Sequence, residues 1–215
     1  MADPTLPHPG RYGPADGAAG VVLTPLRDIA LAAVSARASA GAVLAERFAA
    51  AFDLVPPARP GCATQGDTGL VWLGLDQWLA FRRGLTGAAR FGFAPELAAA
   101  LGAAASVTEM TGSRTILRLS GPRVRDALAK IVSVDLDEIA FPGGAAAVTN
   151  GGYMPVQLWR LAADEPVFEL ACYRSYGESL AEALLQAAGE YGCDLRPGAC
   201  SSQADSPDHP GHAAE

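Results

Sequence analysis

The sequence Ser113-Arg-Thr-Ile-Leu-Arg-Leu-Ser-Gly-Pro-Arg-Val-Arg-Asp-Ala-Leu-Ala-Lys-Ile131 sets the pattern from which the fold can be predicted. Thr115–Leu119 is rich in β-branched and apolar residues and predicts a strand. Gly121 and Pro122 then favour a helix start, because proline is tolerated in the first helical turn. The helix is expected to bury a stripe of residues at i, i+3, i+4 and i+7: Val124, Ala127, Leu128 and Ile131.

The segments on either side extend this pattern of strands and turns. Val107–Met110 is predicted to be a strand, joined to the strand at Thr115–Leu119 by the turn Thr111–Ser113. Pro60–Gly69 and Pro142–Gly152 contain several glycines and are expected to be loops. Further strands are predicted from apolar runs bounded by turn residues: Ile29–Ala36, Leu70–Leu73, Trp78–Phe81, and a hairpin of Val156–Leu161 with Val167–Cys172.

Three more helices are predicted, and together with the strands they define the fold class. One spans Ala40–Phe52, and a second opens at Pro95 and closes at Gly102. Ser175 and Glu178 have the spacing of a capping box. The helix after it is expected to bury four residues: Leu180, Leu184, Ala187 and Tyr191. Strands and helices mix without a regular βαβ repeat, so we expect an α+β fold of mixed or antiparallel sheets with helices packed on one side.

Composition is typical of a folded globular protein and sets the expected domain limits. Hydrophobic residues make up 50% and charged residues 18% of the 215 residues. Residues 1–20 and 196–215 are expected to be disordered arms around one domain at 21–195. The net charge of −7 argues against nucleic acid. No apolar run reaches the ~18 residues of a membrane span, and Met1–Gly10 lacks a signal-peptide pattern. A cytoplasmic location is therefore expected.

The position of the histidines limits the chemistry that this chain can perform. The chain has three, His8, His209 and His212, and all lie in the proline-flanked terminal segments. Serine–histidine and cysteine–histidine couples are therefore excluded from the expected domain. The carboxylates are not arranged as a catalytic pair, and no glycine-rich phosphate loop is present. We expect no catalytic, cofactor-binding or metal-binding residues on this chain.

The four cysteines predict neither a disulfide framework nor a metal site. A chain of this length without a secretion signal does not need disulfides to fold. Cys62 lies in a predicted loop, and Cys172 ends an apolar run and is expected to be a small buried residue. Cys193 and Cys200, followed by His209 and His212, match no compact zinc spacing, so a metal there is the weaker interpretation.

Several aromatic and charged residues have both a structural and an interface interpretation. The three tryptophans fit core packing better than interface anchors: Trp72, Trp78 and Trp159. The arginine clusters Arg82–Arg83 and Arg123–Arg125 fit a solvated face better than a partner contact. Arg114 fits a local contact and a partner contact equally well. Arg160 and Glu169, on opposite arms of the predicted hairpin, are expected to form a cross-strand pair.

Three segments together resemble the gamma subunit of heterotetrameric sarcosine oxidase. The first is Trp72-Leu-Gly-Leu-Asp-Gln-Trp-Leu79, and the second is Ser113–Lys130 with Asp135-Leu136 and Phe141-Pro-Gly143. The third combines Trp159-Arg-Leu161, Phe168-Glu-Leu170, Tyr173-Arg-Ser-Tyr176 and Glu178-Ser-Leu180. Their order and spacing carry the resemblance, which covers roughly residues 21–190. The second segment is also similar to the folate-binding domain of glycine-cleavage T-proteins, and the implied fold is a portion of that architecture.

The resemblance implies a role in an enzyme complex rather than chemistry on this chain. That family of complexes oxidises sarcosine to glycine, releases the methyl carbon as formaldehyde or transfers it to tetrahydrofolate, and reduces oxygen to hydrogen peroxide. FAD, FMN, NAD and tetrahydrofolate are implied on the larger subunits and zinc on the smallest, so the implied partners are alpha, beta and delta subunits. The alternatives are a stand-alone folate-binding domain of the T-protein type and a free-standing structural module.

Overall fold

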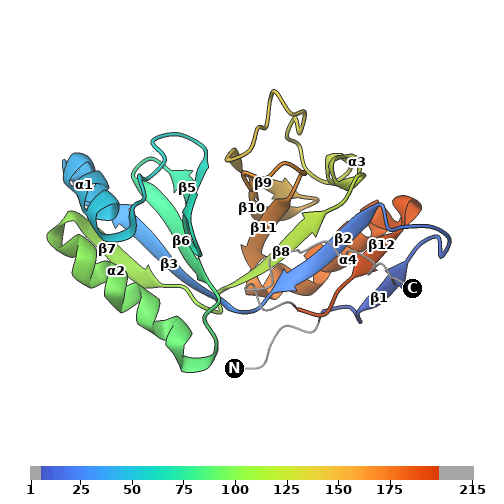
Figure 1. Ribbon diagram of the computed structural model, residues 1–215, viewed down its shortest axis with the longest axis horizontal. Helices are drawn as coiled ribbons and strands as arrows, with labels where there is room; N and C mark the ends of the chain where they lie inside the picture. The colour runs from blue at the N-terminus through green and yellow to red at the C-terminus, as the bar shows by residue number, and fades with distance from the viewer. Residues whose placement is uncertain (1–5, 199–215) are drawn as a thin grey trace, which may run out of the picture.

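The computed structural model describes residues 6–198, which form two β-sheets with helices on their outer faces (Figure 1). The seven-stranded sheet has the order β1-β12-β2-β8-β11-β10-β9, and the five-stranded sheet has the order β4-β5-β6-β3-β7. All neighbours pair antiparallel except β12 and β2. Mixed sheets with packed helices confirm the α+β class.

The strands of the seven-stranded sheet come from the N-terminus, the middle and the C-terminal part of the chain. Their bounds are β1 Gly10–Tyr12, β2 Val21–Leu26, β8 Arg114–Ser120, β9 Ala146–Gly151, β10 Met154–Arg160, β11 Phe168–Tyr173 and β12 Cys193–Leu195. The five-stranded sheet is built from one continuous stretch. Its strands are β3 Ile29–Ala36, β4 Cys62–Gln65, β5 Thr68–Gly74, β6 Gln77–Arg83 and β7 Ala105–Glu109.

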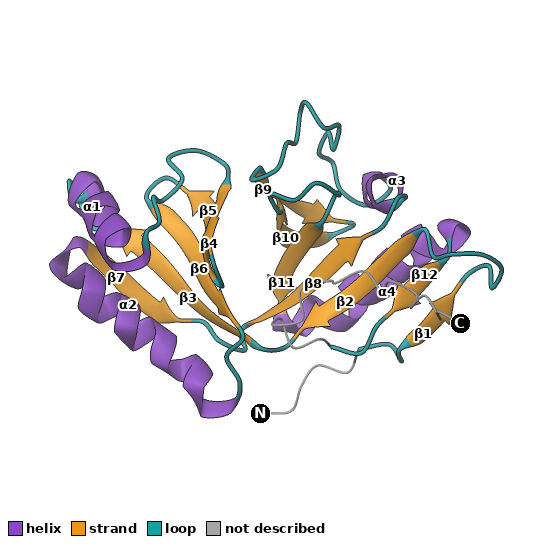
Figure 2. Ribbon diagram, viewed as in Figure 1, coloured by secondary structure: helices purple, strands orange, loops and turns teal. Residues whose placement is uncertain are grey.

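Helices cover the outer face of each sheet, as the purple ribbons of Figure 2 show. The five-stranded sheet packs against α1 and α2 through a core that includes Leu44 and Phe48 of α1. The seven-stranded sheet packs against α3 and α4, with Leu184 of α4 and Val124 of α3 in one core. The helix bounds are α1 Gly41–Phe52, α2 Phe93–Leu101, α3 Val124–Ala129 and α4 Gly177–Ala188. None of these helices of residues 6–198 is long and apolar enough to cross a bilayer.

A third core joins the two sheets to each other. It contains Leu31 and Phe81 from the five-stranded sheet and Ile116 and Trp159 from the seven-stranded sheet. Phe81 and Trp159 stack with their ring centroids 6.1 Å apart. The two sheets are therefore packed as one folded body rather than linked by a tether.

The chain passes between the sheets at two places, and one of them lies directly before β8, at the start of the segment Ser113–Ile131. The turn at Thr111–Ser113 is present, with the Ser113 amide donating to the Met110 carbonyl at 2.9 Å. It does not close a hairpin, however, because β7 pairs with β3 whereas β8 pairs with β2 and β11. The second crossing links β2 to β3 through the short connection after Leu26.

Two predicted loops contain strands. β4 lies inside Pro60–Gly69 and pairs with β5, and β9 lies inside Pro142–Gly152 and pairs with β10. β9 contains two alanines, an asparagine and a glycine, and β4 is only four residues long and contains an alanine, so the local strand signal is weak and tertiary pairing overrides it. The hairpin of β10 and β11 is confirmed.

The predicted capping box at Ser175–Glu178 is wrong. The N-cap of α4 is Tyr176, and no side chain caps the helix. Ser175 instead belongs to a 3₁₀ turn at Arg174–Tyr176 that leads directly into α4. Gly177 follows because a Cβ there would lie 2.5 Å from Thr115 Oγ1, too close for any side chain.

The predicted N-terminal arm is partly folded onto the domain. β1 pairs antiparallel with β12, and the Tyr12 hydroxyl donates to the His8 carbonyl at 2.7 Å. Disorder across 1–20 is therefore wrong at Gly10–Tyr12, where strand pairing supplies partners that the local sequence does not signal. The predicted C-terminal tail, Cys200 and the histidines His209 and His212 lie outside the described residues, apart from residues 196–198.

Candidate functional site

Two arginine-rich sites lie between the sheets, and the first is a buried ion cluster. Glu169 of β11 is fully buried and accepts hydrogen bonds from arginines on both sides. Arg83 of β6 donates through Nη2 to Glu169 Oε2 at 2.8 Å, and Arg118 of β8 donates through Nε and Nη2 to Oε1 at 2.9 and 2.8 Å. Because Arg83 belongs to the other sheet, the cluster ties the two sheets together electrostatically.

The Arg83–Glu169–Arg118 cluster corrects two expectations drawn from sequence. Arg83 lies in the interior, not on a solvated face, and its guanidinium also stacks over the Phe81 ring at 4.3 Å. Glu169 does not pair with Arg160, because the register places Glu169 opposite Trp159 and Arg160 opposite Phe168. Neighbouring positions of a strand point to opposite faces, so Arg160 and Glu169 cannot meet. Arg160 bonds Glu138 at 2.9 Å instead.

The described thiols are held in the protonated form. Burial, followed by the negative charge of Glu169, raises the pKa of Cys62 to about 12. Burial likewise raises the pKa values of Cys172 and Cys193 to about 11. All three are free cysteines, and the thiolate rather than the thiol is the nucleophile and metal ligand. Within residues 6–198, no three His, Cys, Asp or Glu side chains are grouped so that they could hold a metal ion.

The tryptophans and the remaining predicted arginines make local contacts. Trp78 and Trp159 are buried, which confirms their core role, and Trp72 packs partly buried against the core of the five-stranded sheet. The guanidinium of Arg114 stacks over the Tyr173 ring at 3.9 Å. Of the two interpretations of Arg114, a local contact or a partner contact, the structure shows the local contact. Arg123 is half exposed and pairs with Asp126 at 2.7 Å.

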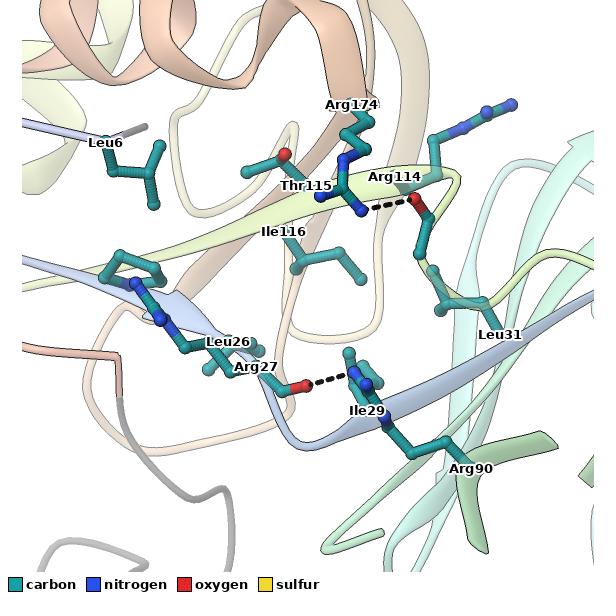
Figure 3. Close-up of a pocket in the computed structure, with 12 residues that line it drawn as sticks. Leu6, Leu26, Arg27, Ile29, Leu31, Arg90, Arg114, Thr115, Ile116 and Arg174 are labelled. Carbon is teal, nitrogen blue, oxygen red and sulfur yellow. Dashed lines mark hydrogen bonds between the residues drawn. The ribbon is translucent and has the colours of Figure 1, made fainter. Parts of the chain in front are cut away.

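The second site is a pocket of about 60 Å³ at the base of the two sheets, where the chain crosses between them (Figure 3). Six apolar side chains line it: Leu6, Pro25, Leu26, Ile29, Leu31 and Ile116. Four arginines also line it, together with Thr115, and no described acidic residue does: Arg27, Arg90, Arg114 and Arg174. We call this the arginine pocket.

Two arginines of the pocket, Arg90 and Arg174, donate to backbone carbonyls. Arg90 donates to the carbonyls of Arg27 at 3.1 Å and Gly87 at 3.4 Å. Arg174 donates through Nη1 to the Gly112 carbonyl at 3.3 Å (Figure 3). Within the described part of the chain, no carboxylate lies in ion-pair range of Arg90 or Arg174. Sequence reasoning missed this site, because its arginines are far apart in the chain and form no motif.

The fold and the sequence first define a class of protein. Residues 85–202, more than half of the chain, match the GCVT N-terminal domain family. The structure of the glycine cleavage system aminomethyltransferase T from Bartonella henselae has the same fold, with a TM-score of 0.54 and 18% identity over 84% of this chain and 48% of that chain. The protein is thus a GCVT N-terminal domain protein.

Closer relatives narrow the class to one family. The chain is 37% identical over 147 residues to the sarcosine oxidase subunit gamma of Arthrobacter sp. The aligned residues cover 66% of this chain and 68% of that protein. A chain of the heterotetrameric sarcosine oxidase from Corynebacterium sp. U-96, solved in complex with pyrrole 2-carboxylate, superposes with a TM-score of 0.67 and 25% identity over 80% of this chain and 85% of its own. The chain belongs to the sarcosine oxidase gamma subunit family.

Proposed function

We propose that this chain is the gamma subunit of a heterotetrameric sarcosine oxidase and that it supports assembly without performing chemistry. The observation that carries the proposal is the 37% identity to a gamma subunit over two thirds of both chains. The interior of the chain fits a supporting role. Glu169, the one fully buried carboxylate among residues 6–198, is neutralised by two arginines, and the described thiols are protonated.

In this proposal, the chemistry belongs to the other subunits of the complex. Alpha, beta and delta subunits would carry FAD, FMN, NAD, tetrahydrofolate and zinc. The complex would oxidise sarcosine to glycine, with formaldehyde or methylene-tetrahydrofolate and hydrogen peroxide as the other products. The gamma chain would provide a folded surface on which the larger subunits pack, and the complex would work in the cytoplasm.

Co-expression tests the proposal directly. A tagged copy of this chain is expressed together with the alpha, beta and delta subunits from the same genome and recovered through its tag. We expect a flavin-coloured complex of four different chains that oxidises sarcosine, whereas the tagged chain purified alone should be colourless and inactive. Recovery of the chain without any of the three partners would refute the proposed role. Calorimetry of the isolated chain with tetrahydrofolate tests the alternative of a stand-alone folate-binding domain, which requires measurable binding.

A further inference from the structure

We propose that the arginine pocket binds a compact carboxylate carried on a short apolar carbon chain. The proposal concerns the pocket lined by Arg90, Arg174, Thr115 and apolar side chains at the crossings between the sheets. It goes beyond the role in assembly, because it assigns a ligand chemistry to Arg90 and Arg174, which the ion cluster does not use.

The first argument is a buried polar atom without a partner. Arg174 lines the pocket, and its Nη2 is inaccessible to solvent and has no hydrogen-bond partner among the described residues. Thr115 also lines the pocket, but its Oγ1 lies on the α4 side of β8, next to Gly177. A guanidinium N–H donates, so an acceptor placed in the pocket would satisfy Arg174 Nη2. Leaving a buried donor unpaired is unfavourable, so an acceptor is expected there.

The second argument is the charge around the pocket. The chain as a whole has a net charge of −7, yet the pocket is lined by arginines and by no described acidic residue. Arg90 and Arg174 bind only backbone carbonyls in the described part of the chain, so their positive charges are not neutralised by an ion pair there. An anion is the ligand that this arrangement favours, and the planar fork of arginine suits a carboxylate.

The third argument is the apolar lining, which restricts the kind of anion. Leu26, Ile29 and Ile116 present hydrocarbon surface next to the guanidinium groups (Figure 3). A volume of about 60 Å³ holds a small group rather than a large molecule. A carboxylate with a few apolar carbons fits both features, because the carbons are removed from water while the charge is paired. Such a group is supplied either by a small dissolved acid or by an acidic side chain of a neighbouring subunit.

Butyrate is a suitable probe for the dissolved form of this chemistry. The full chain, labelled with ¹⁵N in its arginine side chains, is titrated with butyrate and, in parallel, with uncharged butyramide of the same shape. We expect saturable shifts of the Arg174 and Arg90 side-chain signals with butyrate and none with butyramide. Arg174→Gln should weaken binding about tenfold or more. Arg37→Gln changes an exposed arginine outside the pocket and should leave binding unchanged.

A thermal melt accompanies each variant, so that loss of binding is not confused with loss of folding. Arg174→Lys is a second variant that keeps the charge but loses the fork, and it should retain part of the affinity. Equal shifts with butyrate and butyramide would overturn the proposal, as would unchanged butyrate binding in folded Arg174→Gln. The first outcome means that the pocket does not select for charge, and the second means that Arg174 does not hold the carboxylate.

The source of the carboxylate is read from assembly with the alpha, beta and delta subunits. If a partner presents it, Arg174→Gln weakens assembly about tenfold and butyrate competes with the partner. If the carboxylate comes from a small dissolved acid, Arg174→Gln and Arg37→Gln assemble equally well. The butyrate affinity is still lower for Arg174→Gln than for Arg37→Gln. The titration uses this chain alone, so the pocket is tested even if no complex forms and the proposed function fails.

Discussion

The two arginine-rich sites between the sheets differ in how their charges are satisfied. In the Arg83–Glu169–Arg118 cluster, one buried carboxylate accepts three hydrogen bonds from two guanidinium groups. In the arginine pocket, Arg90 and Arg174 reach only backbone carbonyls, and no carboxylate of the described residues lies in ion-pair range of either. The first site is closed and structural, whereas the second has the chemistry of an open site.

The largest expected effect comes from removing the shared counter-ion of the closed site. Glu169→Gln leaves Arg83 and Arg118 facing each other without a negative charge, and removing one partner of a buried ion pair costs about 3–5 kcal/mol. Urea unfolding of the purified chain measures the loss. Glu46→Gln, on the exposed face of α1, is the matched control and should change the free energy of unfolding very little. Equal stability of the two variants would show that the cluster does not hold the sheets together.

The close contact between Thr115 and Gly177 of α4 should give the next largest effect on stability. Gly177→Ala places a Cβ 2.5 Å from Thr115 Oγ1, and such overpacking typically costs about 1–3 kcal/mol. Gly189→Ala is the control, because no atom lies within 4 Å of its added Cβ and its φ is −56°. Thermal unfolding of the two variants gives the difference. A Gly177→Ala variant as stable as Gly189→Ala would mean that the close approach relaxes freely.

Alkaline pH should lower the free energy of unfolding through the ionisation of Cys62, whose thiol is influenced by the charges of Glu169 and Arg83. Burial and then Glu169 raise the pKa of this thiol from its ordinary value of 9.0 to about 12. The folded state thus holds the proton more tightly than the unfolded state does. The contribution to stability is complete below pH 9 and is lost as the pH rises towards 12. Urea unfolding of the native chain and of Cys62→Ala at pH 8 and at pH 10 measures this contribution. The free energy of unfolding should fall less between pH 8 and pH 10 in the variant than in the native chain. A steeper loss in the variant would contradict the burial.

The smallest effect is expected at an ion pair on the outside of the five-stranded sheet. Arg82 donates to both carboxylate oxygens of Glu96 at 2.6 and 3.0 Å, but half of the Glu96 side chain is exposed. Exposed pairs contribute up to about 1 kcal/mol, so Glu96→Gln should cost less than that and lose its effect in high salt. Urea unfolding at two salt concentrations checks this. A cost comparable to that of Glu169→Gln would remove the distinction between buried and exposed pairs.

Local sequence patterns predicted the elements that carry their own periodicity. Val124, Ala127 and Leu128 are buried on α3 as the stripe predicted, and Ile131 lies just past the helix and is partly buried. The strand at Ile29–Ala36 and the hairpin of β10 and β11 are also confirmed. In each case the pattern of apolar residues already specifies which face is buried.

Features that depend on pairing across the fold could not be predicted in this way. The two partners of Glu169 depend on the β8–β11 register, which sets Arg118 opposite it, and on the approach of β6 from the other sheet. Neither can be read from local sequence. The arginine pocket combines Arg27, Arg90 and Arg174 only because the chain crosses twice between the sheets. An arginine-rich composition with a single lysine was the only signal for either site.

The turnover of assembled complexes that contain a weakened gamma chain tests the central claim most directly. The Glu169→Gln chain is co-expressed with alpha, beta and delta subunits, the four-chain complex is isolated, and sarcosine oxidation is measured per bound flavin. A supporting subunit predicts a lower yield of complex but an unchanged kcat for each complex that forms. A kcat reduced tenfold or more in fully assembled complex would contradict the account, because it would place part of the chemistry on this chain.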